Sequence, residues 1–128
     1  MYKKVGYFKR REILKHANFL DLHPLPQHGH EMEEEGTVRV LIPRFNGKIS
    51  KLMLQSRRRS PFIKLSLDEL GSATWLLMDG KNDVRTICRT LREQLGEKIE
   101  PAEERVTKFL SQLYNQDLII FREILKEQ

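Results

Sequence analysis

An alternation of apolar and polar residues predicts β-strands in the middle of the chain. Residues 37–42 (TVRVLI) are rich in β-branched side chains, which is typical of a strand. Residues 61–67 (PFIKLSL) alternate with the two-residue period of a strand. Because Pro61 has no backbone N–H, this strand is expected at the edge of a sheet, or to begin at that proline. The segment 48–55 (KISKLMLQ) fits a further strand or a short helix.

Two helices are predicted after these strands from their start and stop signals. Ser66 and Glu69 form an S-x-x-E capping box, which marks the start of the first helix. The Asp79-Gly80 pair marks its end. Asp83 is a suitable N-cap for the second helix, and Gly96 ends it. Apolar residues at helical spacing give each helix a buried face: Leu70, Ala73, Trp75, Leu76 and Leu77 in the first, and Val84, Ile87, Cys88, Leu91 and Leu95 in the second.

A third helix and a short strand complete the pattern. Pro101 suits the first turn of a helix whose apolar stripe includes Val106, Phe109 and Leu110. Residues 118–121 (LIIF) then indicate a short final strand. The order of elements predicts an α+β fold of the winged helix-turn-helix type, with a small antiparallel β-sheet followed by three α-helices.

The first 35 residues are expected to form a separate N-terminal extension. Residues 8–20 fit a short amphipathic helix, and the prolines within residues 23–26 break it. Residues 28–35 are polar and are interpreted as a linker. We therefore expect a partly mobile extension over residues 1–35 and one folded domain over residues 36–128.

Charge is distributed unevenly along the chain. The formal net charge is +5, but residues 36–67 hold eight Lys and Arg residues and no Asp or Glu. A positive field of this kind favours an anionic partner such as nucleic acid, an acidic peptide or a membrane surface. Lys and Arg that merely keep a strand edge soluble would explain the pattern equally well.

Several function classes are disfavoured by the composition. A single cysteine, Cys88, excludes an internal disulfide and a cysteine-based zinc site, and its place on an apolar helix face indicates a buried structural thiol. No apolar run is long enough to cross a membrane and no signal peptide is present, so a soluble cytoplasmic protein is expected. His28, His30 and Glu31 could bind a divalent cation, but their position in a polar linker favours an exposed tail. We expect no enzymatic activity, no metal and no cofactor.

Roughly residues 36–121 resemble the PqqD family, including the strand segments VLIPRF and FIKLSL. The matching features are L-D-E-L-G-S-A-x-W at residues 67–75, the Asp79-Gly80 pair, V-R-T-I at 84–87, and F-L-x-x-L at 109–113 followed by L-I. The resemblance implies a small winged-helix module that binds the leader of a ribosomally synthesised precursor peptide. Such modules present the leader to a modifying enzyme, often a radical SAM protein, and are not catalysts. The resemblance does not imply that pyrroloquinoline quinone is the product.

The resemblance also implies where the peptide binds. In the family the peptide adds as an extra strand to the third strand and packs along the third helix, which correspond here to residues 61–67 and 102–114. Exchanging Ile63 for proline is expected to remove one backbone donor from that strand edge. The predicted peptide-binding residues are Phe62, Ile63, Lys64, Leu65, Ser66, Arg105, Lys108, Phe109 and Gln112.

Each of these residues has an expected role. Phe109 would form the floor of the groove, and the polar residues of the third helix its rim. Lys64 and the run Arg57, Arg58 and Arg59 would attract an acidic ligand. The alternation of Ile63, Leu65 and Leu67 is explained equally well if these side chains only form part of the core. Both roles are compatible, because the backbone can bind the peptide while the side chains fill the core.

Two alternatives remain. A winged-helix transcriptional regulator would bind DNA, with a phosphate-binding wing at Arg57–Arg59. Glu103 and Glu104 in the first turn of the third helix would repel phosphates, which argues against nucleic acid. A docking scaffold would instead use residues 8–20 to bind a larger enzyme, or a second copy of the chain to give a homodimer.

Overall fold

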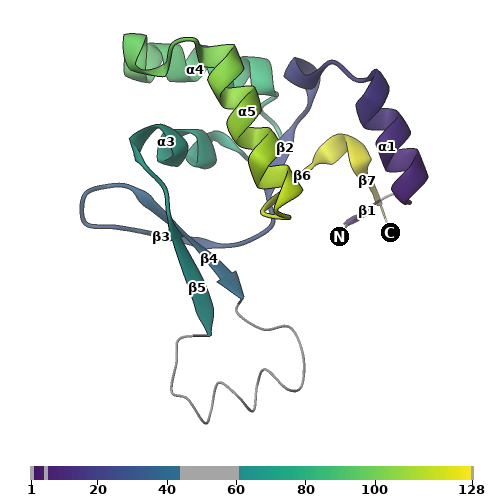
Figure 1. The fold of residues 1–128 in the computed structure, drawn as a ribbon, viewed down its shortest axis with the longest axis horizontal. Coiled ribbons are helices and arrows are strands. Elements are labelled where there is room, and N and C mark those ends of the chain that lie inside the picture. The colour runs from purple at the N-terminus through teal and green to yellow at the C-terminus, as the bar shows by residue number, and fades with distance from the viewer. Residues whose placement is uncertain (1, 5, 44–60, 128) are drawn as a thin grey trace. The chain divides into compact units, whose positions relative to one another are not determined.

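The computed structural model describes residues 2–4, 6–43 and 61–127 (Figure 1). Its strands are β1 (Tyr2–Lys4), β2 (Pro24–Pro26), β3 (His30–Met32), β4 (Val38–Pro43), β5 (Phe62–Ser66), β6 (Ile119–Phe121) and β7 (Leu125–Glu127). Its helices are α1 (Tyr7–His16), α3 (Glu69–Leu77), α4 (Val84–Leu95) and α5 (Ala102–Asn115), with short 3-10 turns η1 (Phe19–Asp21), η2 (Gly96–Ile99) and η3 (Arg122–Ile124). The chain divides into two compact units, residues 28–72 and residues 1–27 with 73–128.

The unit of residues 28–72 contains a three-stranded antiparallel sheet in the order β3-β4-β5. The strands predicted from residues 37–42 and 61–67 are confirmed as β4 and β5. The polar-linker prediction is wrong for residues 30–32, which form β3. The chain reverses between β3 and β4 through a turn in which the Glu33 N–H donates to the Thr37 carbonyl at 2.8 Å. Gly36 has a φ of +88° there, a conformation that glycine adopts without steric cost.

The start of α3 differs from the predicted capping box. Ser66 is the last residue of β5, and the Asp68 carboxylate caps the first turn by accepting a hydrogen bond from the Gly71 N–H at 2.7 Å. The capping role of Ser66 is therefore wrong. Since Ser66 is still paired with β4 in extended conformation, the first residue free to cap the helix is Asp68.

The second unit is built around α4 and α5, which pack against each other. The Asp83 carboxylate accepts a hydrogen bond from the Thr86 N–H at 2.7 Å, and Gly96 ends α4 with a φ of +58°, as predicted. The buried residues of the two helices lie at the predicted helical spacing: Val84, Ile87, Cys88 and Leu91 in α4, and Ala102, Val106, Leu110 and Leu113 in α5. Trp75 is also fully buried, which confirms its predicted place in the core.

The N-terminal segment pairs with the C-terminal one in this unit. β1 pairs with β7, and β2 pairs with β6 in an antiparallel register that sets Leu25 opposite Ile120. The His23 N–H and imidazole both bind the Glu123 carboxylate, which fixes the start of β2 to η3. The prediction of a final strand at residues 118–121 is confirmed, and residues 24–26 of the predicted extension are its partner.

Antiparallel strands β3–β5 followed by helices α3–α5 confirm the predicted α+β class. No helix in the described part of the chain is both long and apolar enough to cross a membrane.

Candidate functional site

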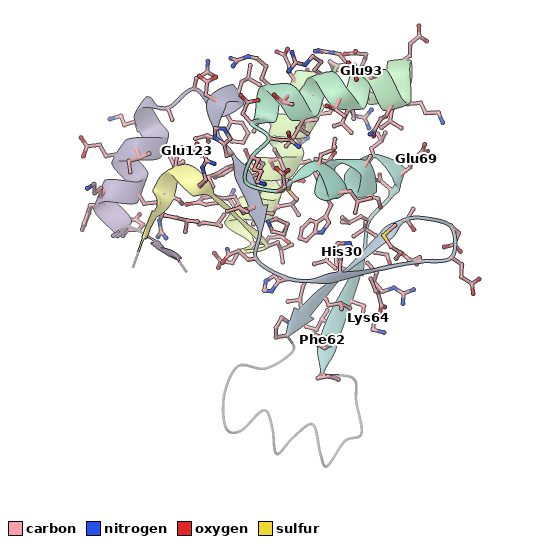
Figure 2. All side chains as sticks on the ribbon, turned by 180° about the vertical axis from the view of Figure 1, so that it is seen from behind. His30, Phe62, Lys64, Glu69, Glu93 and Glu123 are labelled. Atoms are coloured by element: carbon pink, nitrogen blue, oxygen red, sulfur yellow. The ribbon has the colours of Figure 1, made fainter. Side chains whose placement is uncertain are left out.

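β5 lies at an edge of its sheet. It pairs with β4 on one side, and within residues 2–4, 6–43 and 61–127 no strand pairs with its other side. The register sets Leu65 opposite Val40, and the Leu67 N–H donates to the Val38 carbonyl at 2.9 Å. Since the hydrogen-bonding direction alternates along an antiparallel strand, the backbone groups of Lys64 and Ser66 point away from β4. These groups form an edge that can accept another strand; Figure 2 labels Lys64 on this strand.

This register also corrects one predicted perturbation. Ile63 is paired with Ile42, in the same hydrogen-bonding phase as Leu65 and Leu67. Its N–H therefore points toward β4 and not toward the open edge. Proline at position 63 would break the internal ladder of the sheet, so the expectation that it removes a donor from the open edge is wrong.

The two faces of the sheet differ in chemistry. Residues opposite each other across a pair of strands share a face. Val40 is buried, and its partner Leu65 is half-buried on the same face. Ile63 follows on that face but keeps 45% of its surface exposed. A strand added to β5 would thus lie beside the accessible apolar side chain of Ile63 on one face of the sheet, and beside the polar side chains of Lys64 and Ser66 on the other face.

The polar face carries a network of ion pairs. Arg39 on β4 binds Glu31 at 3.0 Å and Glu33 at 3.1 Å, both through its guanidinium. The Lys64 ammonium on β5 lies 3.3 Å from Glu31. Hydrogen bonds from Lys64 and then Arg39 lower the pKa of Glu31, and the hydrogen bond from Arg39 lowers the pKa of Glu33. Ser66 also bonds to Glu33, so the network links all three strands.

This network changes the charge that is expected beside the β5 edge. Arg39 and Lys64 are the two described basic residues of the positive segment 36–67, and each is paired with a carboxylate of β3. Their field is therefore partly neutralised. Arg57, Arg58 and Arg59, the predicted anion-steering residues, lie outside the described residues. Sequence reasoning missed the neutralisation because it placed Glu31 and Glu33 in a linker.

The predicted α5 residues occupy one face of that helix. Arg105, Lys108, Phe109 and Gln112 are spaced three or four positions apart, and only Phe109 is half-buried while the others are exposed. The Arg105 guanidinium donates to the Lys98 carbonyl at 2.6 Å, which holds the side chain against η2. These residues belong to a different unit from β5. Their role in peptide binding stays a prediction.

Ser72 in α3 has a structural role that links the helix to β4. Ser72 is 3% exposed, and its hydroxyl accepts a hydrogen bond from the Val38 N–H at 2.8 Å and donates to the Leu67 carbonyl at 3.3 Å. It therefore satisfies a buried backbone donor at the start of β4. This serine lies within the L-D-E-L-G-S-A-x-W string, and its role was not predicted from the sequence. Its position near the start of a predicted helix was a signal for such a role, because serine side chains there often form hydrogen bonds with nearby backbone N–H or carbonyl groups.

Other chemically reactive residues have ordinary surroundings. Cys88 is buried as predicted, and burial raises the pKa of its thiol. Among the residues that the structure describes, no group of three His, Cys, Asp or Glu side chains could hold a metal ion. Glu103 and Glu104 are exposed in the first turn of α5.

Comparisons with protein families, curated proteins and solved structures relate this chain to one family. A protein-family model described as Coenzyme PQQ synthesis protein D (PqqD) matches residues 63–119, from β5 to the start of β6. No significant match was found among curated proteins or among solved structures. The matched region contains the β5 edge and all of α3, α4 and α5.

Proposed function

Residues 63–119 form a PqqD family domain, and from this premise we propose that the chain binds the leader of a ribosomally synthesised precursor peptide by β-strand addition. PqqD family proteins are non-catalytic peptide chaperones, in agreement with the expectation of no enzymatic activity. In the proposed function the bound leader is presented to a modifying enzyme, such as a radical SAM protein. The observation that carries the proposal is the outward-facing backbone of β5.

The β5 edge supplies backbone hydrogen bonds for the added strand. Lys64 and Ser66 each offer one N–H and one carbonyl on the side away from β4. With about 0.5–1.5 kcal/mol for each net hydrogen bond, these groups contribute about 2–6 kcal/mol. A dissociation constant of 1 μM requires about 8 kcal/mol, so side-chain contacts must supply the rest. Peptide sequence therefore matters for affinity as well as for specificity.

Side chains beside the edge favour a peptide that alternates apolar and acidic residues. On one face of the added strand, an apolar side chain would cover the exposed part of Ile63. On the other face, a carboxylate would reach the Lys64 ammonium, which it would share with Glu31. On α5, Phe109 and Arg105 are proposed as further peptide-binding residues, as the resemblance to the family implies.

The test separates the backbone of the edge from its side chains. Lys64→Pro removes an outward N–H, which proline can do at an edge without breaking the ladder to β4. Lys64→Ala is the matched control, since it removes the same side chain but keeps the N–H. Candidate leaders are peptides encoded by short reading frames beside the gene, and binding is measured by fluorescence anisotropy with a DNA duplex as the competing ligand.

The proposal predicts a graded result. Lys64→Ala should weaken the binding of an acidic leader about two- to fivefold, and Lys64→Pro should weaken it about a further two- to tenfold, the value of one lost hydrogen bond. Equal affinities for the two variants, with both folded, would exclude the β5 edge as the binding site. Tighter binding of the DNA duplex than of every leader would favour a winged-helix DNA-binding protein instead.

A further inference from the structure

A groove lies along α1 in the unit of residues 1–27 and 73–128. Its inner end is a cavity of about 260 Å³ between α1 and the C-terminal part of α5. The cavity is lined mainly by apolar and aromatic side chains, among them Leu14, Phe19, Tyr114 and Phe121. The ring of Phe121 lies 5.5 Å from that of Phe19 and 5.2 Å from that of Tyr114. This end of the groove suits an apolar side chain.

The outer end of the groove is basic. A second hollow of about 390 Å³ shares Leu14 and Tyr114 with the first and is also lined by Tyr7, Arg10 and Arg11. We call the two hollows together the α1 groove. Their common lining residues make the two hollows adjacent, so a chain that passes over both can reach the arginines and the aromatic cavity.

The cations of α1 differ from the two paired arginines of α4, Arg85 and Arg92. α1 carries Lys9, Arg10, Arg11 and Lys15 against one acidic residue, Glu12. In the described part of the chain none of these four cations has a carboxylate within ion-pair distance, whereas Arg85 and Arg92 on α4 are both paired. These four cations therefore form no ion pair within the described residues, and the Asp117 side chain lines the same hollow as Arg10 and Arg11.

Exposed aromatic side chains lie beside these cations. Phe8 is 82% exposed and Tyr7 is 58% exposed, and their rings pack edge to face at a centroid distance of 5.3 Å. The Arg10 guanidinium lies 5.9 Å above the Tyr7 ring. Aromatic and arginine side chains are enriched at protein interfaces, and exposed aromatic residues of this size are uncommon elsewhere on a surface.

We propose that the α1 groove binds an acidic segment of a second protein. An apolar side chain of that segment enters the cavity at Phe121, and flanking carboxylates pair with Arg10 and Arg11. The inference does not rest on the proposed leader binding, because it uses other residues in the other unit. The apolar cavity favours a protein over nucleic acid, because its mainly apolar and aromatic lining suits an aliphatic side chain.

The test uses three short fluorescein-labelled peptides. The first carries leucine anchors among glutamates, the second replaces the glutamates by glutamines, and the third replaces the leucines by serines. The double variant Arg10→Glu/Arg11→Glu reverses the charge of the groove. Arg89→Glu, at an exposed position of α4, is a control that reverses one charge outside the groove. Ser111→Phe fills the apolar cavity without changing charge.

The expected result is binding of the first peptide alone, with a dissociation constant on the order of 10 μM. The double variant should weaken it at least about tenfold, Ser111→Phe should weaken it similarly, and Arg89→Glu should change it less than about twofold. Lys64→Pro should leave it unchanged, which separates this site from the β5 edge.

Three results would overturn the proposal: equal binding of the glutamine peptide, wild-type affinity in the double variant, or no binding of the first peptide at millimolar concentration. Tighter binding of single-stranded DNA or of phosphatidylserine vesicles would also overturn it, since either would assign the groove to another class of partner. Circular dichroism of each variant checks folding, since the double variant changes the half-buried Arg10 as well as the exposed Arg11.

Discussion

Removal of the Ser72 hydroxyl should destabilise the fold measurably. The hydroxyl is the acceptor for the N–H of Val38, the first residue of β4, and both residues are buried. Ser72→Ala leaves that N–H without a partner and without access to water, because Val38 is 0% exposed. The sheet that carries the β5 edge would then begin with an unsatisfied backbone donor.

The size of the effect follows from two opposing contributions. An unsatisfied buried N–H costs about 1–3 kcal/mol. Alanine is a better helix former than serine by about 0.5 kcal/mol, which offsets part of this cost in α3. The net loss of unfolding free energy is therefore about 0.5–2.5 kcal/mol. For a chain of 128 residues this corresponds to a fall in melting temperature of about 2–10 °C.

Urea unfolding followed by circular dichroism measures this free energy. Ser111→Ala in α5 is the matched control: it makes the same exchange in a helix, and no hydrogen bond of the Ser111 side chain is found in the described part of the chain. The control should be unchanged or slightly more stable. Amide exchange of Val38 should also become faster in Ser72→Ala. If the two variants are equally stable and Val38 exchange is unchanged, the hydrogen bond does not hold β4 as argued.

Three further predictions concern stability, pH and cysteine chemistry. Gly80→Ala should cost at least about 1–2 kcal/mol in thermal unfolding, since φ is +77° and a Cβ would lie 2.6 Å from Leu25 Cδ2; wild-type stability would contradict this. Hydrogen bonds from Thr86 lower the pKa of Asp83, so its stabilising effect is complete above the ordinary aspartate pKa and is lost as pH falls through the lowered value. The stability difference between wild type and Asp83→Ala should therefore shrink in acid, and a difference that grows would refute the sign. Cys88 should react with iodoacetamide only slowly until the protein is unfolded, because the thiol is buried and its pKa is raised; rapid alkylation of the native protein would show otherwise.

Local sequence signals were sufficient for the helices that follow the sheet and for the strands β4, β5 and β6. Asp83 and Gly96 bound α4 because a side-chain cap and a positive φ are determined by neighbouring residues alone. β5 was also predictable, since its two-residue alternation reflects the two faces of a sheet. In each case the physical cause lies within a few residues of the element.

The features that sequence reasoning missed depend on distant residues. β3 has only three residues and no β-branched side chain, so its extended conformation depends on pairing with β4. The pairing of Lys64 with Glu31 likewise requires the fold to bring two strands together across β4. The register with β4 determines which N–H groups of β5 point toward the open edge. The sequence does not show this register, and for that reason the proline variant was predicted at Ile63 and not at Lys64.

Amide hydrogen exchange along β5 tests peptide binding by strand addition most directly. In the free protein, the N–H groups of Ile63 and Leu65 face β4 and should exchange slowly, whereas those of Lys64 and Ser66 face outward and should exchange faster. Addition of a leader peptide should slow the exchange of Lys64 and Ser66 strongly and leave the other two nearly unchanged. A leader that binds without protecting Lys64 and Ser66 would contradict strand addition at this edge.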